Sequence, residues 1–284
     1  MKVKDKVILV TGGGNGMGRE LVLHLLSKGS KVVAVDVNEV KLIETMALAG
    51  VYMNSLMTIK ADITDREAIE EIPSKILARF GTIDGIINNA GIIQPFHKVN
   101  DMTFDMISRV FNINFMGALN IVKVFTPYLI NRPEAHIVNI SSMGGFLPVA
   151  GQAIYGASKA AVKILSESLT SELSETNVGV TTVFPGAIST NIKANSGLGL
   201  DAGAGPEGHA ENAAFSPARA AEIMINAIEY KKKRVYIGKD SKLMNILYKF
   251  VPAVAVNMIY QKMKNKLTGG TTNVDLAITA PKVA

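Results

Sequence analysis

The chain has 284 residues, of which 48% are apolar, so the composition favours a large buried core and excludes global disorder. It contains no cysteine, which excludes disulfide frameworks and thiolate chemistry and fits a reducing compartment. The histidines are scattered without the spacing of metal ligands, so no metal site is predicted at His24, His97, His136 or His209.

The net charge of +6 is concentrated near the C-terminus, where residues 231–266 hold ten Lys/Arg against one acid, Asp240. The basic run 231–234 is interpreted as a solvated turn before a strand, and no nucleic-acid motif accompanies it, so we expect no nucleic-acid partner. The first ten residues do not resemble a signal peptide, and no uncharged apolar run approaches the roughly 20 residues that span a membrane. A cytoplasmic location is therefore expected.

Short β-branched runs alternate with longer helical patterns along the chain. Several runs, such as 32–35, are almost continuously apolar, which is typical of parallel strands buried on both faces. The alternation predicts βαβ units and an α/β fold with a doubly wound parallel sheet. Strands are predicted at 6–10, 31–35, 56–60, 83–88, 135–140, 178–184 and 234–237, and helices near 16–28, 38–49, 65–79, 103–130, 153–176 and 217–230.

Two regions stand outside this alternation. The Gly- and Ala-rich stretch 195–216 is long for a structureless loop, which is typical of a functional or a disordered segment, and a simple surface excursion is the alternative. After residue 240, apolar residues recur at helical spacing until Pro252 interrupts the pattern. We expect a catalytic domain over 1–240 and a helical extension over 241–284 of the same domain, with 267–284 a flexible tail or an oligomer arm.

The stretch TGGGNGMG, residues 11–18, contains five glycines directly after the first predicted strand. Glycine inside a regular element costs about 0.5–1 kcal/mol relative to alanine, so the cluster indicates a tight turn or a close approach of the backbone to a ligand. Unpaired N–H groups at the start of the following helix favour a phosphate, and a dinucleotide pyrophosphate is the predicted ligand. A plain tight turn is the alternative.

An acidic residue, Asp36, ends the second predicted strand, eighteen residues after Gly18. A carboxylate there accepts hydrogen bonds from ribose hydroxyls and repels a 2′-phosphate. Because neither Asn15 nor Val37 is a compensating Arg or Lys, the sequence favours NAD over NADP. Asp36 as a helix cap is the alternative, and Asp62 has the same two interpretations, adenine contact or cap.

Tyr155 and Lys159 lie four residues apart on a predicted helix and therefore share one face. An ammonium group near the phenol favours phenolate and lowers its pKa, so Tyr155 is the candidate acid/base. Ser142 lies thirteen residues earlier, at the end of a strand, where its hydroxyl can polarise a carbonyl oxygen.

TGGGNGMG, Asn88-Asn89-Ala90-Gly91, Asn114 within NINFMG, Ser142, YGASK and Pro185-Gly186 follow one another in order. Together they resemble the short-chain dehydrogenase/reductase family over roughly residues 5 to 240. The resemblance implies a single-domain Rossmann fold with about seven strands, binding NAD(P), and a homodimer or homotetramer.

The resemblance also implies roles for individual residues. Tyr155 is the expected acid/base, Lys159 holds the ribose and lowers the tyrosine pKa, Ser142 stabilises the substrate oxygen, and Asn114 positions a water in the proton relay. Spacing favours Asn114 over Asn112 and Ser142 over Ser141. The expected cofactor contacts are Gly12, Gly14, Asn15, Gly16, Met17, Gly18, Asp36, Val37, Asp62, Ile63, Asn89, Ala90, Gly91, Tyr155, Lys159, Pro185, Gly186, Ile188 and Thr190.

The expected activity is NAD-dependent interconversion of a secondary alcohol and a ketone, with oxidation as the favoured direction. A lid from 190–216 and an apolar lining predict a hydrophobic substrate that is steroid-, retinoid- or lipid-like. The predicted substrate contacts are Ser142, Gly144, Phe146, Leu147, Val149 and Tyr155.

Three alternatives follow from the same sequence. A non-enzymatic NAD(H)-binding sensor would keep the fold, but the presence of all four expected catalytic residues, Asn114, Ser142, Tyr155 and Lys159, argues against it. A methyltransferase would have no use for Ser142, Tyr155 and Lys159. The basic, amphipathic C-terminal extension is expected to pack over the cleft or another subunit, with peripheral membrane contact as the alternative.

Overall fold

Seven parallel strands form a single sheet with the order β3-β2-β1-β4-β5-β6-β7, which confirms the predicted doubly wound α/β fold. The computed structural model describes residues 1–189, 192, 196 and 215–268. Each predicted strand is present, with ends within two residues of the expectation. The strands are β1 (Val7–Thr11), β2 (Lys31–Asp36), β3 (Leu56–Lys60), β4 (Gly85–Asn88), β5 (Ala135–Ile140), β6 (Val178–Pro185) and β7 (Arg234–Ile237).

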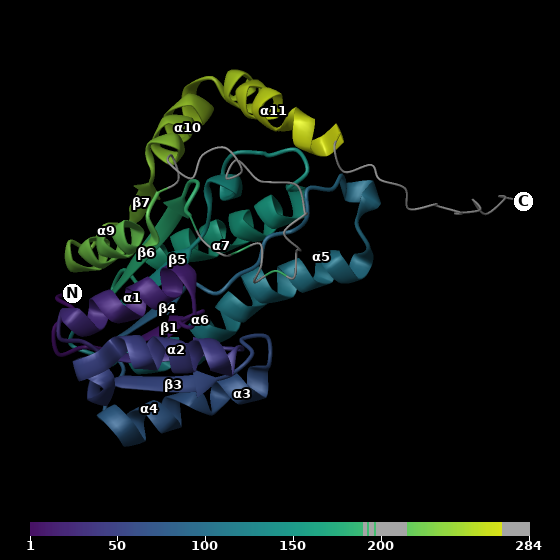
Figure 1. Cartoon of the computed structure of the whole chain (residues 1–284). Coiled ribbons are helices and arrows are strands. Elements are labelled where there is room, and N and C mark those ends of the chain that lie inside the picture. Colours follow the sequence, from purple (N-terminus) through teal and green to yellow (C-terminus); the bar gives the residue numbers. More distant parts are fainter. Residues whose placement is uncertain (190–191, 193–195, 197–214, 269–284) are drawn as a thin grey trace, which may run out of the picture.

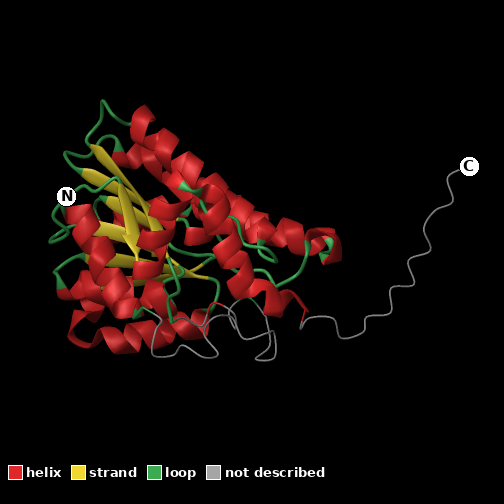
Figure 2. Ribbon diagram, turned by 90° about the horizontal axis from the view of Figure 1, so that it is seen from above, coloured by secondary structure: helices red, strands yellow, loops and turns green. Residues whose placement is uncertain are grey.

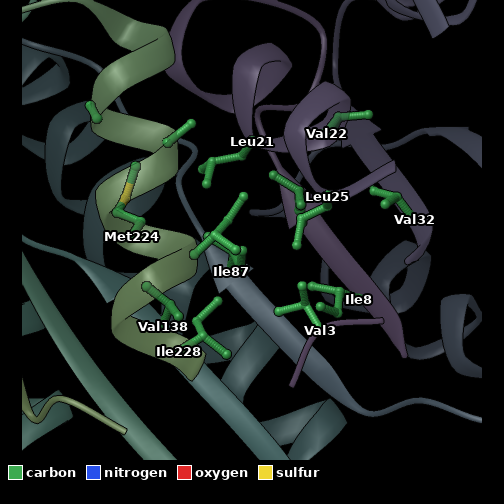
Figure 3. Packing of buried hydrophobic residues seen from close by; sticks show 14 of the residues in the cluster. Val3, Ile8, Leu21, Val22, Leu25, Val32, Ile87, Val138, Met224 and Ile228 are labelled. Carbon is green, nitrogen blue, oxygen red and sulfur yellow. The ribbon is translucent and has the colours of Figure 1, made fainter. Parts of the chain in front are cut away.

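Helices cover both faces of the sheet (Figure 2). On one face, Leu21 and Leu25 of α1 and Met224 and Ile228 of α9 pack over the strands (Figure 3). On the other face, α4, α6 and α7 bury their apolar residues in a second core. The helices that carry these cores are α1 (Gly16–Ser27), α2 (Glu39–Ala49), α3 (Arg66–Glu70), α4 (Ile72–Phe80), α6 (Gly117–Leu129), α7 (Ala153–Glu172) and α9 (Pro217–Glu229). A further helix, α5 (Phe104–Phe111), precedes α6.

Two predicted helices are divided in the structure. The pattern at 65–79 forms α3 and α4, because Pro73 suits the first turn of a new helix better than the interior of a continuous one. The pattern at 103–130 forms α5 and α6, joined by a π-helical turn at Asn112–Met116. Such turns are frequent at functional sites, and this one carries Asn114.

The C-terminal extension forms two helices, α10 (Lys239–Phe250) and α11 (Pro252–Thr268), divided where Pro252 predicted an interruption (Figure 1). Their inner residues, which include Met244, Ile259 and Met263, pack with Leu147 in a third apolar cluster. The extension thus covers the segment that follows β5. Of the helices in the described ranges, none combines the length and the apolar character needed to cross a bilayer.

Candidate functional site

A cavity of about 320 Å³ lies at the carboxyl ends of β1 to β4. The strand order reverses between β1 and β4, and ligands of doubly wound sheets bind at such a switch point. The predicted residues that line it are Gly12, Asn15, Gly16, Met17, Asp36, Val37, Asp62, Ile63, Asn89, Ala90 and Gly91.

The glycine-rich turn fits one wall of this cavity because two of its positions have no room for a side chain. Gly12 has a φ of 67°, and a Cβ there would lie 2.8 Å from the Asn89 amide nitrogen. A Cβ on Gly18 would lie 1.9 Å from the Gly12 carbonyl oxygen. The start of α1 is therefore pressed against the end of β1, and Asn15 caps it by accepting the Gly16 N–H at 2.7 Å. Gly14 and Gly18 support this turn without lining the cavity.

The Asp36 carboxylate joins the end of β2 to the glycine-rich turn. One oxygen accepts the Gly14 N–H and the other the Asn38 N–H, both at 2.9 Å. The backbone thus fixes the carboxylate at the cavity wall. A cation that the sequence analysis missed, Lys41, lines the same wall, and its ammonium lies 2.7 Å from Glu44, whose pKa it lowers below the usual range.

The residues after β3 and β4 complete the cavity. Asp62 accepts the N–H of Thr64 at 2.8 Å and lines the cavity. The cap interpretation is wrong for Asp62, because the N-cap of α3 is Asp65, whose side chain accepts the Ala68 N–H. Asn89 donates to the Thr11 carbonyl oxygen at 3.0 Å and ties the end of β4 to β1. This contact supports the central strands of the sheet at the edge where the cavity lies.

Ser142 and Tyr155 meet beyond the end of β5, where the Ser142 hydroxyl lies close enough to the Tyr155 hydroxyl to act on its pKa. Lys159 lies one turn further along α7, buried, and donates from Nζ to the Ile140 carbonyl oxygen at 3.0 Å. The neighbouring Ser141 is also buried, and its hydroxyl donates to the Lys159 carbonyl oxygen at 2.7 Å. The structure therefore brings Ser142, rather than Ser141, to the tyrosine hydroxyl.

Burial governs the acid–base properties of this cluster. It lowers the pKa of Lys159 from 10.5 to about 8, because the ammonium loses its hydration. It also raises the pKa of Tyr155, and the hydrogen bond from Ser142 offsets part of that rise. The sequence analysis expected the lysine to lower the Tyr155 pKa. In the protein alone desolvation is the largest contribution and raises the pKa of Tyr155, so a lowering by the lysine stays a prediction.

Asn114 links the segment after β4 to α7. Its carbonyl oxygen accepts the Ile92 N–H at 2.8 Å, and its amide group donates to the Ile92 carbonyl oxygen and the Ser158 hydroxyl, each at 3.0 Å. Both amide hydrogens are thus used within the protein. The side chain holds the site together, so a water in a proton relay would have to donate to the second lone pair of the Asn114 carbonyl oxygen or bind other atoms.

Gln94 is a positioning residue that the sequence analysis missed. Its buried side chain accepts the Tyr155 backbone N–H at 2.7 Å and donates to the Gly151 carbonyl oxygen at 3.0 Å. It thereby satisfies a donor in the first turn of α7, whose N-cap residue, Gln152, makes no capping bond through its side chain. No local motif marks this residue, because its partners lie some 60 positions away.

A second cavity, of about 580 Å³, lies between α7, α11 and the segment after β5. Gly144, Phe146 and Val149 line it, as expected for a substrate surface, but Ser142 and Tyr155 do not. The prediction for Leu147 differs from the structure, because this residue is fully buried in the cluster beneath α10 and α11.

The segment after β6 begins at the same edge of the sheet. Asp240, at the start of α10, accepts the Ala187 N–H at 2.9 Å, and its carboxylate fills the space where a Cβ on Gly186 would lie. Ile188 is buried and pairs with Phe215, so it does not line the first cavity. Thr190 and most of the predicted lid lie outside the described residues.

Several residues of the first cavity were not predicted from sequence. Val35, Ala61 and Ile92 stand next to the predicted residues Asp36, Asp62 and Gly91, so a search one residue further along the chain would have found them. Arg109 and Ile192 come from distant segments that no motif marks. The missed residues are Val35, Asn38, Lys41, Ala61, Ile92, Arg109, Ile113 and Ile192.

The fold and the site define an α/β oxidoreductase of the dinucleotide-binding class. The family model for short chain dehydrogenase matches residues 6–200. SadH of Mycobacterium tuberculosis, provisionally named an oxidoreductase, is 34% identical over 249 residues, which are 86% of this chain and 90% of SadH. The uncharacterized oxidoreductase SERP2049 of Staphylococcus epidermidis is 32% identical over 198 residues, which are 70% of this chain and 84% of that protein.

Solved structures share the fold at lower identity. A short-chain dehydrogenase/reductase from Burkholderia phymatum in complex with NAD superposes with a TM-score of 0.77 at 23% identity, covering 94% of this chain and 97% of that one. A short chain dehydrogenase from Burkholderia cenocepacia in complex with NADP gives 0.76 at 23% identity, covering 91% and 99%. The chain belongs to the short-chain dehydrogenase family, and it is an oxidoreductase that uses NAD or NADP.

Proposed function

We propose that the protein is an NAD-dependent dehydrogenase that interconverts a hydrophobic secondary alcohol and the corresponding ketone. The observation that carries the proposal is the pair of neighbouring hydroxyls, Ser142 and Tyr155, together with a cavity whose wall holds the Asp36 carboxylate. The absence of a side chain at Gly12 and Gly18 gives that cavity the close backbone approach that a pyrophosphate needs.

The chain's own residues supply the proton chemistry. The dinucleotide, when bound, accepts or returns the hydride at its nicotinamide ring. Tyr155 takes the proton from the substrate hydroxyl during oxidation and returns it during reduction. Ser142 donates a hydrogen bond to the same substrate oxygen and fixes its position. Lys159 holds a positive charge behind the tyrosine below pH of about 8.

The preference for NAD is proposed from Asp36. Its carboxylate is fixed by two backbone N–H groups and lies where a ribose would be held. A 2′-phosphate there would meet like charge, and the nearby Lys41 ammonium is paired with Glu44. Asp36→Asn should therefore weaken NADH binding and improve NADPH binding, changing their affinity ratio roughly 10- to 100-fold.

The hydrophobic substrate is proposed from the surfaces that approach the tyrosine. Gly144 lies against the Tyr155 ring, since a Cβ there would be 3.5 Å from that ring. Phe146 and Val149 continue this surface with apolar side chains. Such walls offer no charged partner to a substrate, which favours a steroid-, retinoid- or lipid-like alcohol.

The test is NADH formation at 340 nm with a panel of hydrophobic secondary alcohols, comparing the wild type with Tyr155→Phe. We expect turnover with NAD and a loss of roughly 10²- to 10⁴-fold in the variant. Tyr128→Phe, a change of the same size at an exposed tyrosine, is the matched control. Equal turnover in wild type and Tyr155→Phe would contradict the proposed role of Tyr155. NADH binding without turnover on any alcohol would favour a non-enzymatic NAD(H)-binding protein.

A further inference from the structure

The first helix of the C-terminal extension, α10, exposes an apolar face. Leu243, Ile246 and Phe250 are 52%, 55% and 79% exposed. Their spacing of three and four residues places them on one side of the helix. The residues that α10 buries, Ser241 and Met244, lie on the other side. The outer face therefore consists of large apolar side chains that the packing of the domain does not use.

The second helix, α11, has the same division. Ala255, Ile259 and Met263 are buried, whereas Val254 and Met258 on another side are 51% and 46% exposed. Isolated exposed apolar residues are normal on protein surfaces. Two consecutive helices that both turn such residues outward indicate a surface that binds something.

The charge of this surface identifies the kind of partner. Lys239, Lys242 and Lys249 of α10 and Lys262 of α11 are exposed, and in the described part of the chain none of them forms a salt bridge. The acid within 231–266, Asp240, is already bound to the Ala187 N–H. Lysines whose stems run beside exposed apolar residues can keep their ammonium groups in water while the apolar residues enter an acyl layer.

A second copy of the chain fits this surface less well. A symmetric contact would bring the lysines of both copies into one interface, where Asp240 is the acid that this stretch supplies to balance them. A nucleic acid would pair with the cations but would leave Leu243, Ile246 and Phe250 in water. An anionic lipid surface satisfies both features.

We propose that α10 and α11 bind the surface of an anionic bilayer, with Leu243, Ile246 and Phe250 inserted and the lysines of both helices paired with lipid headgroups. This inference is independent of the proposed catalytic function, since it uses no residue of the site. It places the second cavity, which Val256 and Ile259 of α11 help to line, beside the lipid.

The test is co-sedimentation of the full chain with vesicles of phosphatidylcholine alone or mixed with phosphatidylglycerol. We expect binding to the mixed vesicles only, weakening as salt rises. Each lysine near an anionic surface is worth about 1 kcal/mol, so Lys242→Gln with Lys249→Gln should weaken binding roughly 25-fold. Leu243→Ser with Phe250→Ser should also reduce binding at least roughly tenfold.

The control is Ile43→Ser with Val51→Ser, because these residues are also exposed, at 64% and 91%, but lie in and just after α2. Circular dichroism and thermal unfolding verify that each variant is folded. No binding of the wild type to the mixed vesicles at low salt would overturn the proposal. Equal weakening of vesicle binding by Ile43→Ser with Val51→Ser would also overturn it. So would unchanged vesicle binding of Leu243→Ser with Phe250→Ser, accompanied by a change of oligomeric state in sedimentation.

Discussion

Replacing the buried ammonium of Lys159 by methionine should stabilise the protein at neutral pH while it abolishes activity. The ammonium is buried with a single hydrogen bond, 3.0 Å long, to the Ile140 carbonyl oxygen. No acid faces it in the described residues, and desolvation alone lowers its pKa. Keeping this charge therefore costs folding energy, which methionine, a similar apolar chain, would release.

The size of the effect follows from the pKa. A fall from 10.5 to about 8 corresponds to about 3 kcal/mol at pH 7. Methionine leaves the Ile140 carbonyl without its partner, which costs about 1–3 kcal/mol. The net gain at pH 7 is then about 1 kcal/mol. Because the unfolded chain binds more protons between pH 8 and 10.5, the wild type gains stability as pH rises through that window, and at pH 10 the charge costs less than about 1 kcal/mol.

The expected result is therefore a change of sign: Lys159→Met is more stable than the wild type at pH 7 and less stable at pH 10. Urea unfolding followed by circular dichroism at the two pH values measures both differences. Lys163→Met is the matched control, since Lys163 lies on the same helix, is partly exposed and pairs with Glu167. A stability difference between Lys159→Met and wild type that does not vary with pH would refute the reasoning.

Three further substitutions test the scaffold of the site. Gly18→Ala should lower the free energy of unfolding by about 1–3 kcal/mol or more, because its Cβ would lie 1.9 Å from the Gly12 carbonyl oxygen. Gly144→Ala is the control and should lower it less, since a Cβ there has ordinary contacts. Gln94→Leu should lower kcat and cost about 1–3 kcal/mol, since the Tyr155 N–H and the Gly151 carbonyl lose a buried partner; unchanged thermal unfolding would contradict this. Asp240→Ala should raise the KM for NAD by freeing the Ala187 segment, and Asp240→Asn, which keeps an acceptor oxygen, should retain more affinity.

The sheet was predictable because its strands are short, apolar and separated by helical patterns of ordinary length. Periodicity could not show where a helix changes its hydrogen-bonding pattern. The predicted helix at 103–130 contains a π-helical turn around Asn114 that depends on contacts with Ile92 and Ser158 from distant segments. The same limit explains Gln94, whose function appears only once the chain is folded.

The apolar residues after Ser142 show a second limit of the sequence. Gly144, Phe146, Leu147 and Val149 are equally apolar in the sequence, and all were predicted to contact substrate. The structure divides them, because α10 and α11 cover Leu147 and leave the other three at a cavity wall. Which residues a C-terminal extension covers depends on how it packs, and hydrophobicity along the chain does not encode that choice.

The opposite pKa changes of Tyr155 and Lys159 mean that the protein alone is not prepared for base catalysis. Burial raises the pKa of Tyr155, while Lys159 loses its proton from about pH 8, before the phenol can ionise. The lysine alone is therefore expected to favour the phenolate only weakly at the pH at which the phenol ionises. A further positive charge near the phenol is needed to lower the pKa of Tyr155. The positively charged nicotinamide of the oxidised cofactor would supply that charge, so Tyr155 would become a base only when this form is bound.

The pKa of the Tyr155 hydroxyl can be measured by titrating tyrosine absorbance at 295 nm in the wild type and in Tyr155→Phe. The chain has seven tyrosines, so the difference between the two curves isolates Tyr155. Without cofactor, Tyr155 should ionise above the ordinary pKa of 10, and with NAD⁺ bound it should ionise at lower pH, whereas NADH should produce a smaller change. A Tyr155 that already ionises below pH 10 in the protein alone would show that Lys159 is sufficient. The pKa of Tyr155 would then be set by the folded protein itself, whether or not the cofactor is bound.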